Sequence, residues 1–218
     1  MNVEIRLPRT SEECAAALRL AEHEYQVRSY VKGLEPLVGD AVVLIATENE
    51  EIMGTVSVAL GTSILPTEEY FGLHATEIFP VEPAQIMEIG RLAVSSTAEG
   101  MTKIVILSGL IAAIQMWGDE HGVKIAIASL KPSLRRALTL MDIASTVIAD
   151  ADDLIRERVP SVYAGYFLPD SPRHRPIAVS MVLDEVREPI LTNPAIIGSR
   201  VQISVKAPSA PLTGVSAA

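Results

Sequence analysis

Cysteine, aromatic residues and positive charge are all scarce in this sequence of 218 residues. The single cysteine, Cys14, permits no internal disulfide and no cysteine-rich zinc site, which favours a reducing, cytoplasmic location. Aromatic residues make up 4%, so aliphatic side chains must supply most of any core. Lys and Arg number 18 against 27 Asp and Glu, a net charge of −9, which argues against nucleic acid as a partner.

Membrane-targeting segments and metal-binding patterns are also lacking. Residues 1–9 contain no apolar core of the kind that signal peptides carry. The most apolar long segment, 104–117, is too short to span a bilayer and includes Ser108 and Gln115, so it predicts a buried helix and no transmembrane segment. The four histidines are scattered without metal-ligand spacing, so no metal site is predicted.

Hydrophobic residues are abundant, and their order along the chain predicts a mixed α/β fold. They make up 49% of the residues, enough for a globular core. The length fits one domain, placed at 1–206, followed by a small-residue tail at 207–218 that is predicted to be disordered. Periodicity predicts strands at 3–7, 41–46, 52–60, 86–94, 124–130, 162–168 and 177–183, and helices at 10–31, 101–121, 133–141 and, less regularly, 150–158.

The connection 62–85 is long and is interrupted by Pro66, Gly72, Pro80 and Pro83. A connection of this length in a compact domain is typical of a binding loop or lid, and Thr67 can open a short helix within it. The strand that follows carries two charges, Glu88 and Arg91, among apolar residues.

Glu88 and Arg91 would point to opposite faces of a regular strand, because side chains alternate. Both can face one cleft if a bulge intervenes, and Gly90 between them is a residue type common at bulges. A plain ion pair or two edge charges would explain the same residues without any function.

The segment Met87–Val94 resembles the signature strand of the N-acyl amino acid synthase family. Its relatives, the acyl-homoserine-lactone synthases, carry a similar Glu-x-Ser-Arg pattern. The similarity extends over roughly 10–143 and includes 27–31, 65–71, and the strand 124–130 with the Pro-Ser-Leu that follows at 132–134. The resemblance implies the GNAT fold, a mixed and largely antiparallel sheet with helices on both faces.

The resemblance also implies roles for the charged pair. Glu88 would act as the general base that takes a proton from an attacking amine, directly or through a water. Arg91 would position a substrate carbonyl or carboxylate, or hold Glu88 ionised. The family usually has Ser where this chain has Gly90, so the hydroxyl of that residue is missing here.

Further residues have expected binding roles within the same resemblance. The arm of the thioester donor would bind exposed strand amides, and its phosphate would bind the start of the next helix. The amine acceptor would contact residues at the end of the first helix. The donor-binding residues would be Leu92, Ala93, Val94, Gly100, Met101 and Thr102, and the acceptor-binding residues Arg28 and Tyr30.

The phosphate-binding loop departs from the acetyltransferase pattern. In the window 97–102 only Gly100 fits that pattern, and Glu99 would repel a pyrophosphate. The loop therefore favours an acyl carrier protein, which presents a single phosphodiester, over coenzyme A. Such an acidic carrier could dock at Arg135–Arg136 or at Arg173–Arg175, although solvated loops and helix faces are the commoner explanation for such basic groups.

The leading interpretation is an N-acyltransferase that moves a fatty acyl group from an acyl carrier protein or acyl-CoA to the amine of an amino acid or similar small molecule. The thioester is a co-substrate, and no permanently bound cofactor is expected. Two alternatives stay open: an acetyl-CoA-dependent N-acetyltransferase, and a non-catalytic GNAT-like module that binds an acyl ligand.

Overall fold

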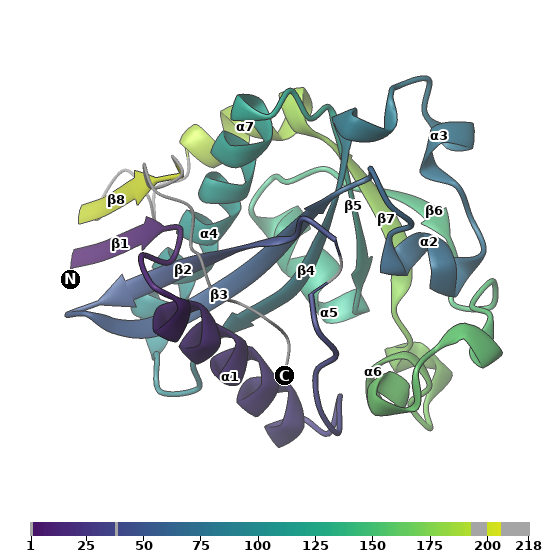
Figure 1. The fold of residues 1–218 in the computed structure, drawn as a ribbon, viewed down its shortest axis with the longest axis horizontal. Coiled ribbons are helices and arrows are strands. Elements are labelled where there is room, and N and C mark those ends of the chain that lie inside the picture. The colour runs from purple at the N-terminus through teal and green to yellow at the C-terminus, as the bar shows by residue number, and fades with distance from the viewer. Residues whose placement is uncertain (1, 38, 193–199, 206–218) are drawn as a thin grey trace.

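The computed structural model describes residues 2–37, 39–192 and 200–205, which form one eight-stranded sheet with helices on both faces (Figure 1). The strands are β1 (Asn2–Arg6), β2 (Val42–Glu48), β3 (Glu51–Leu60), β4 (Ile86–Val94), β5 (Ile125–Leu130), β6 (Thr146–Ala149), β7 (Ile177–Val182) and β8 (Arg200–Ser204). The α-helices are α1 (Ser11–Val27), α2 (Pro66–Phe71), α3 (Ala75–Ile78), α4 (Gly100–Glu120), α5 (Pro132–Leu140), α6 (Ala164–Phe167) and α7 (Leu183–Leu191). Short 3₁₀ turns lie at Pro83–Gln85, Arg156–Arg158, Ser161–Tyr163 and Pro172–His174.

The strand order across the sheet is β6-β7-β5-β4-β3-β2-β1-β8. The β4–β5 and β1–β8 pairs are parallel, and the other pairs within the described residues are antiparallel. The centre of the sheet is open, because β4 pairs with β5 only through Ile86–Glu88. β4 then continues to Val94 without β5 beside it, so the two strands separate toward their carboxyl ends (Figure 1).

Alternation along β2 shows how the two faces are covered. Leu44 and Ala46 are buried in the main core together with side chains of α4, whereas Val43 and Ile45 pack with Ala17 of α1. α1 and α4 therefore lie on opposite faces of the sheet, as Figure 1 shows. This arrangement confirms the predicted mixed, largely antiparallel sheet with helices on both faces.

The start of α1 is fixed by side-chain hydrogen bonds at the place that the sequence predicted. Thr10 Oγ1 accepts a hydrogen bond from the Glu13 N–H at 3.2 Å. The Glu13 carboxylate reaches the Arg9 N–H at 2.6 Å and forms an ion pair with Arg6 at 2.7 Å. These contacts, with Arg6 first among them, lower the pKa of Glu13 to about 2. α1 ends at Val27, earlier than the predicted residue 31.

α4 is long and apolar enough to cross a membrane by length and composition alone, and it is longer than the apolar segment considered from the sequence. In the structure, 56% of its most apolar window is buried inside the protein. Ile106, Leu110 and Ala113 belong to the main core. Packing of this helix against the sheet accounts for its composition.

The last third of the chain differs most from the prediction. The predicted strand 162–168 is wrong: these residues form a 3₁₀ turn and the short α6, and a Cβ on Gly165 would lie only 2.0 Å from the Ser29 carbonyl oxygen. This close approach holds a turn against the end of α1, where an extended strand would not fit. The predicted helix 150–158 is also wrong beyond its 3₁₀ turn. β6, α7 and β8 were not predicted, and the predicted tail 207–218 lies outside the described residues.

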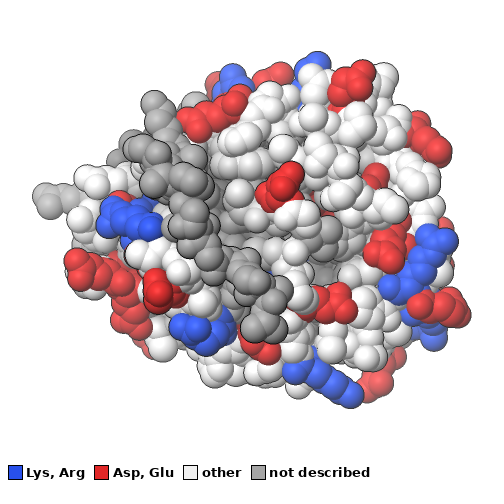
Figure 2. Space-filling view, viewed as in Figure 1, with Lys and Arg blue, Asp and Glu red and all other residues white. Residues whose placement is uncertain are grey.

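On the face of the molecule in Figure 2, the acidic and basic side chains of the described residues are interspersed. No continuous basic surface is visible among these residues on that face. The charge on this side of the protein is therefore distributed.

Candidate active site

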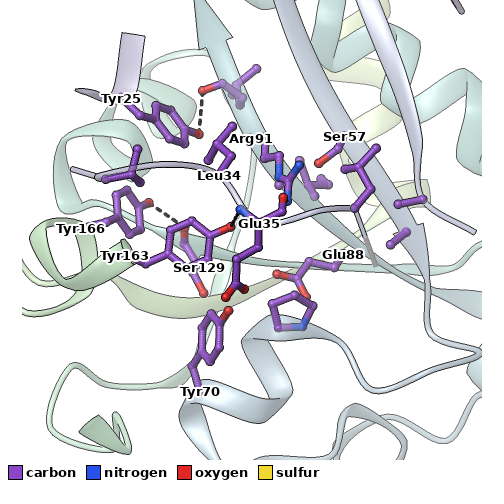
Figure 3. A pocket seen from close by; sticks show the side chains of 18 of the residues that line it. Tyr25, Leu34, Glu35, Ser57, Tyr70, Glu88, Arg91, Ser129, Tyr163 and Tyr166 are labelled. Atoms are coloured by element: carbon purple, nitrogen blue, oxygen red, sulfur yellow. Dashed lines mark hydrogen bonds between the residues drawn. The ribbon is translucent and has the colours of Figure 1, made fainter. Parts of the chain in front are cut away.

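A cavity of about 190 Å³ opens beside the point where β4 and β5 separate. Its walls come from regions distant in sequence: the end of α1 and the segment after it, β3, α2, β4, β5 with the start of α5, and the turn that contains α6 (Figure 3). The polar residues in its lining are Tyr25, Glu35, Ser57, Tyr70, Glu88, Arg91, Ser129, Tyr163 and Tyr166.

A bulge in β4 brings Glu88 and Arg91 to this one cavity. The pairing with β3 shifts by one residue between Gly90, opposite Ser57, and Ala93, opposite Thr55. Arg91 takes up the extra residue with a positive φ of 53°, a conformation that is uncommon for a residue other than glycine. Both charged residues line the cavity, as a bulge would require, but the left-handed residue is Arg91 and not Gly90.

Glu88 is held at the cavity wall by Thr67. The Thr67 N–H donates to Glu88 Oε2 at 3.0 Å, and the Thr67 hydroxyl donates to Oε1 at 2.8 Å. The same hydroxyl lies 2.9 Å from Ser129 Oγ. Burial is the largest influence on the acid and outweighs the hydrogen bonds, so the pKa of Glu88 is raised to about 7.

Arg91 joins β4 to the segment after α1. Its Nη2 donates to the carbonyl oxygens of Glu35, at 2.5 Å, and Pro36, at 3.1 Å. The Glu35 N–H in turn donates to the hydroxyl of Tyr163 at 2.9 Å. Figure 3 shows the Glu35 carboxyl group directed toward Tyr70 on the inner side of the cavity. Arg91 Nε and Nη1 have no hydrogen bond to any described residue.

The cavity has a hydroxyl close to the position where the family's Ser is replaced. A Cβ built on Gly90 would lie 3.2 Å from Ser57 Oγ, and Ser57 lines the cavity. Ser57 of β3 therefore places a hydroxyl at the cavity wall beside position 90, where the family usually has Ser.

Three tyrosines form one side of the cavity and continue beyond it. Tyr25 donates to the Leu92 carbonyl at 3.1 Å, and Tyr166 donates to the Ser129 carbonyl at 2.8 Å. The Tyr25 and Tyr166 rings stack at 6.4 Å, and Tyr30 contacts both edge-on. Burial raises the pKa of Tyr25 and of Tyr166 well above its ordinary value, so both remain neutral phenols that can donate hydrogen bonds.

The predicted strand amides divide into two groups. The Ser95 N–H donates to the Met53 carbonyl of β3, so alternation turns the Val94 N–H away from β3 and the Ala93 N–H toward it. The Leu92 carbonyl accepts from Tyr25 and therefore also points away from β3. Leu92 and Val94 thus direct their backbone groups to the side where β5 has separated, and Ala93 does not.

The other predicted residues lie outside this cavity. Gly100, with φ of 51°, Met101 and Thr102 form the first turn of α4 and do not line it. Arg28 forms an ion pair with Glu24 at 2.7 Å, and both Arg28 and Tyr30 line a separate shallow groove. The structure therefore unites Glu88 and Arg91 but separates them from the predicted phosphate and acceptor residues.

A smaller apolar pocket of about 40 Å³ adjoins the cavity on the α4 side of the sheet. It shares Ile89, Leu92, Leu130 and Leu134 with the cavity. Its remaining lining comes from α4, α5, β5, β7 and α7 and is almost wholly aliphatic. The cavity thus borders an apolar space beside the separated strands.

Sequence reasoning missed several residues of the site: Glu35, Ser57, Thr67, Tyr70 and Ser129. The one signal that could have indicated any of them was the length of the 62–85 connection, which was predicted to be a binding loop. α2 lies in that connection and supplies Thr67 and Tyr70. Among the described residues, no group of three or more His, Cys, Asp or Glu side chains could hold a metal ion.

A sheet that opens after a bulged central strand, with helices on both faces, defines a GNAT-like fold. Solved structures with this fold include FeeM, an N-acyl amino acid synthase from uncultured soil microbes, with a TM-score of 0.58 at 15% identity over 86% of this chain and 99% of that one. The CoA-dependent acyl-homoserine lactone synthase BjaI, solved with SAM and isopentyl-CoA, has a TM-score of 0.61 at 13% identity, over 95% of this chain and 94% of that one. The AHL synthase LasI has a TM-score of 0.56 at 11% identity, over 94% of this chain and 98% of that one.

These neighbours agree with the resemblance of the central strand, and at these identities they establish the fold. No protein-family model matches the sequence, and no curated protein matches it significantly. The activity therefore has to be argued from the cavity itself.

Proposed function

We propose that the protein is an N-acyltransferase, built as one domain over 1–206, which transfers an acyl group from a thioester donor to an amine. The observation that carries the proposal is Glu88, a buried carboxyl whose pKa is raised to about 7 at the wall of a cavity between separated strands. A carboxyl with this pKa accepts a proton near neutral pH more readily than an ordinary glutamate.

The reaction is a direct displacement at the thioester carbonyl. The amine nitrogen forms a bond to the carbonyl carbon, its proton passes to the Glu88 carboxylate, and the carbon–sulfur bond breaks to release a thiolate. Backbone N–H groups of Leu92 and Val94, on the side without β5, would polarise the carbonyl. The thiolate then takes a proton from solvent.

The apolar pocket supports a fatty acyl donor. An acyl chain that entered between β4 and β5 would lie against Ile89, Leu92, Leu130 and Leu134, which border both spaces. The charge of the loop before α4 favours a carrier protein over coenzyme A as the source of this chain. A single cysteine and a thioester donor make the cytoplasm the proposed compartment.

The free side of Arg91 supports an amino acid as the acceptor. Nη2 is held by two carbonyl oxygens, which fixes the guanidinium plane and leaves either Nη1 or Nε to donate a hydrogen bond to a carboxylate oxygen. The amine of the same molecule would then face Glu88 across the cavity. Tyr70 and Tyr163 provide aromatic walls for its side chain.

The test is lipid extraction and mass spectrometry of a bacterial host that expresses the wild-type protein or Arg91→Ala. N-acylated amino acids present only with the wild type support the proposal and identify chain and acceptor together. The same extract from cells that express Glu88→Gln should also lack the product. If no new lipid forms but purified protein turns over acetyl-CoA, the protein is an acetyltransferase; if neither occurs, it is a binding module and the proposal fails.

A further inference from the structure

The loop before α4 already binds a carboxylate of the protein itself. Glu24 of α1 is 1% exposed, and its Oε1 accepts a hydrogen bond from the Ser96 N–H at 2.7 Å. Burial alone would raise the pKa of this carboxyl, but hydrogen bonds from Ser96 and Arg28 outweigh it and keep the pKa below its ordinary value. Glu99, the residue that precedes α4, adds a second acidic group. The Ser96 N–H is therefore already occupied and does not donate to a donor phosphate, and the charge of Glu99 disfavours an anion nearby.

A second surface at the same end of the sheet carries the opposite charge. It is a shallow groove of about 640 Å³ between the end of α1, the start of α5 and residues 164–174. Arg28, Lys131, Arg173 and His174 line it, and Asp170 is the one acidic residue in its lining. Within the described ranges, the side chains of Arg173 and His174 have no hydrogen bond or ion pair, so both can bind an anion.

The groove and the cavity meet at one aromatic wall. Tyr30 lines the groove, Tyr166 lines the cavity, and their ring centroids are 5.4 Å apart. Lys131 fixes this wall: its Nζ lies 4.5 Å from the Tyr166 ring and donates to the carbonyl oxygens of Tyr166 and His174. One layer of tyrosine rings therefore separates the groove from the cavity, and a flexible arm that starts in the groove would have to pass this wall to reach the cavity.

We propose that this groove binds the phosphate of a phosphopantetheine arm, in place of the loop before α4. Arg173 and His174 are the free donors, and the first turn of α5 adds the positive end of a nine-residue helix. The ligand is a single phosphodiester of the kind that an acyl carrier protein presents. This inference rests on the proposed function, because it assigns the position of the donor of that reaction.

The experiment compares two donors with the same acyl group, acyl-phosphopantetheine and acyl-pantetheine, which differ only in the phosphate. The phosphomonoester of the first donor stands in for the phosphodiester of a carrier protein. Thiol release is followed with the acceptor that lipid extraction identifies, and the ratio of the two kcat/KM values is determined for each protein. Wild type should favour the phosphorylated donor by about tenfold, a value typical of one or two charge-assisted hydrogen bonds at a partly exposed site. Arg173→Gln should bring the ratio close to one. A ratio within one protein does not depend on how much of that protein is folded.

The matched control is Lys103→Gln, which removes a cation from the first turn of α4. The wild-type ratio should persist in this variant. If Lys103→Gln loses the preference for the phosphorylated donor and Arg173→Gln keeps it, the phosphate binds at the loop before α4 and the inference is overturned. A wild-type ratio of one would overturn it while leaving the acyltransferase intact, whereas no thiol release from either donor would reject the proposed function.

Acyl-CoA as a third donor tests the source of the phosphate. A groove that accepts one phosphate group gains nothing from the 3′-phospho-AMP portion that distinguishes coenzyme A from phosphopantetheine, so acyl-CoA should match acyl-phosphopantetheine within about threefold. A preference for acyl-CoA of tenfold or more would refute the assignment to a carrier protein.

Discussion

Replacing Glu88 with glutamine should lower activity and raise stability at once. The pKa of Glu88 is about 7 in the folded protein against 4.5 for a free glutamate, so the folded state binds more protons between these values. Wild-type stability therefore falls as pH rises from 4.5 to 7, and the difference corresponds to about 3 kcal/mol. Glu88→Gln escapes this cost, because glutamine does not ionise and can still accept from the Thr67 N–H.

The assay is urea unfolding of wild type and Glu88→Gln at pH 5 and pH 8, with the exposed Glu120→Gln as the matched control. The stability of Glu88→Gln relative to wild type should increase by about 2–3 kcal/mol between the two pH values, and that of Glu120→Gln should not change. Acyl transfer by Glu88→Gln should fall by about 10²–10⁴. A relative stability that is the same at both pH values would show that Glu88 is not a buried acid with a raised pKa.

Three further changes probe two residues of the site and the packing of the main core. Thr67→Val removes the hydroxyl that donates to Glu88, so the pKa of Glu88 should rise further and the acid limb of the pH–rate profile should move to higher pH. Thr67→Ser is the control and should retain the wild-type profile. An acid limb that does not move in Thr67→Val would contradict this hydrogen bond. Arg91→Gly should be more stable than Arg91→Ala by about 1 kcal/mol in urea unfolding, because φ at this residue is 53°; equal stabilities would show that the bulge relaxes. Gly109→Ala should destabilise the protein by about 1–3 kcal/mol, because the alanine Cβ would lie 2.2 Å from Ile5 Cδ1. Ile5→Val in the same chain should recover part of the lost stability. A thermal midpoint of Gly109→Ala equal to that of wild type would argue against this close packing.

The elements that sequence predicted well are those whose signal is local. The strands 52–60 and 86–94 and the helix 101–121 are rich in apolar residues, and each lies within a residue or two of its observed bounds. The bulge was also predictable in principle, because Glu88 and Arg91 can face one cleft only if a bulge interrupts the regular alternation of side chains. Nothing local could show that Arg91 would take the left-handed conformation, because β3 and the carbonyl groups of Glu35 and Pro36 impose it.

What sequence could not reveal depends on contacts between distant segments. Thr67 reaches Glu88 from a loop 21 positions earlier, and Tyr166 reaches Ser129 from a turn 37 positions later. The residues 162–168 combine aromatic and apolar residues as a strand does, yet packing on the end of α1 bends them into a turn. The groove of Arg28, Lys131, Arg173 and His174 likewise exists only because three segments converge on one surface.

The parallel pairing of β1 with β8 has a consequence for how the chain folds. Asn2–Arg6 lies beside Arg200–Ser204, so nearly the whole described chain separates the two strands. Contacts of such long sequence separation form slowly, because closure of so large a loop costs entropy before any contact stabilises it. During synthesis the outer edge of β1 would stay unpaired until β8 left the ribosome, and an unpaired edge is a site for aggregation. The yield of folded protein should therefore depend on a strand that lies at the far side of the sheet from the cavity.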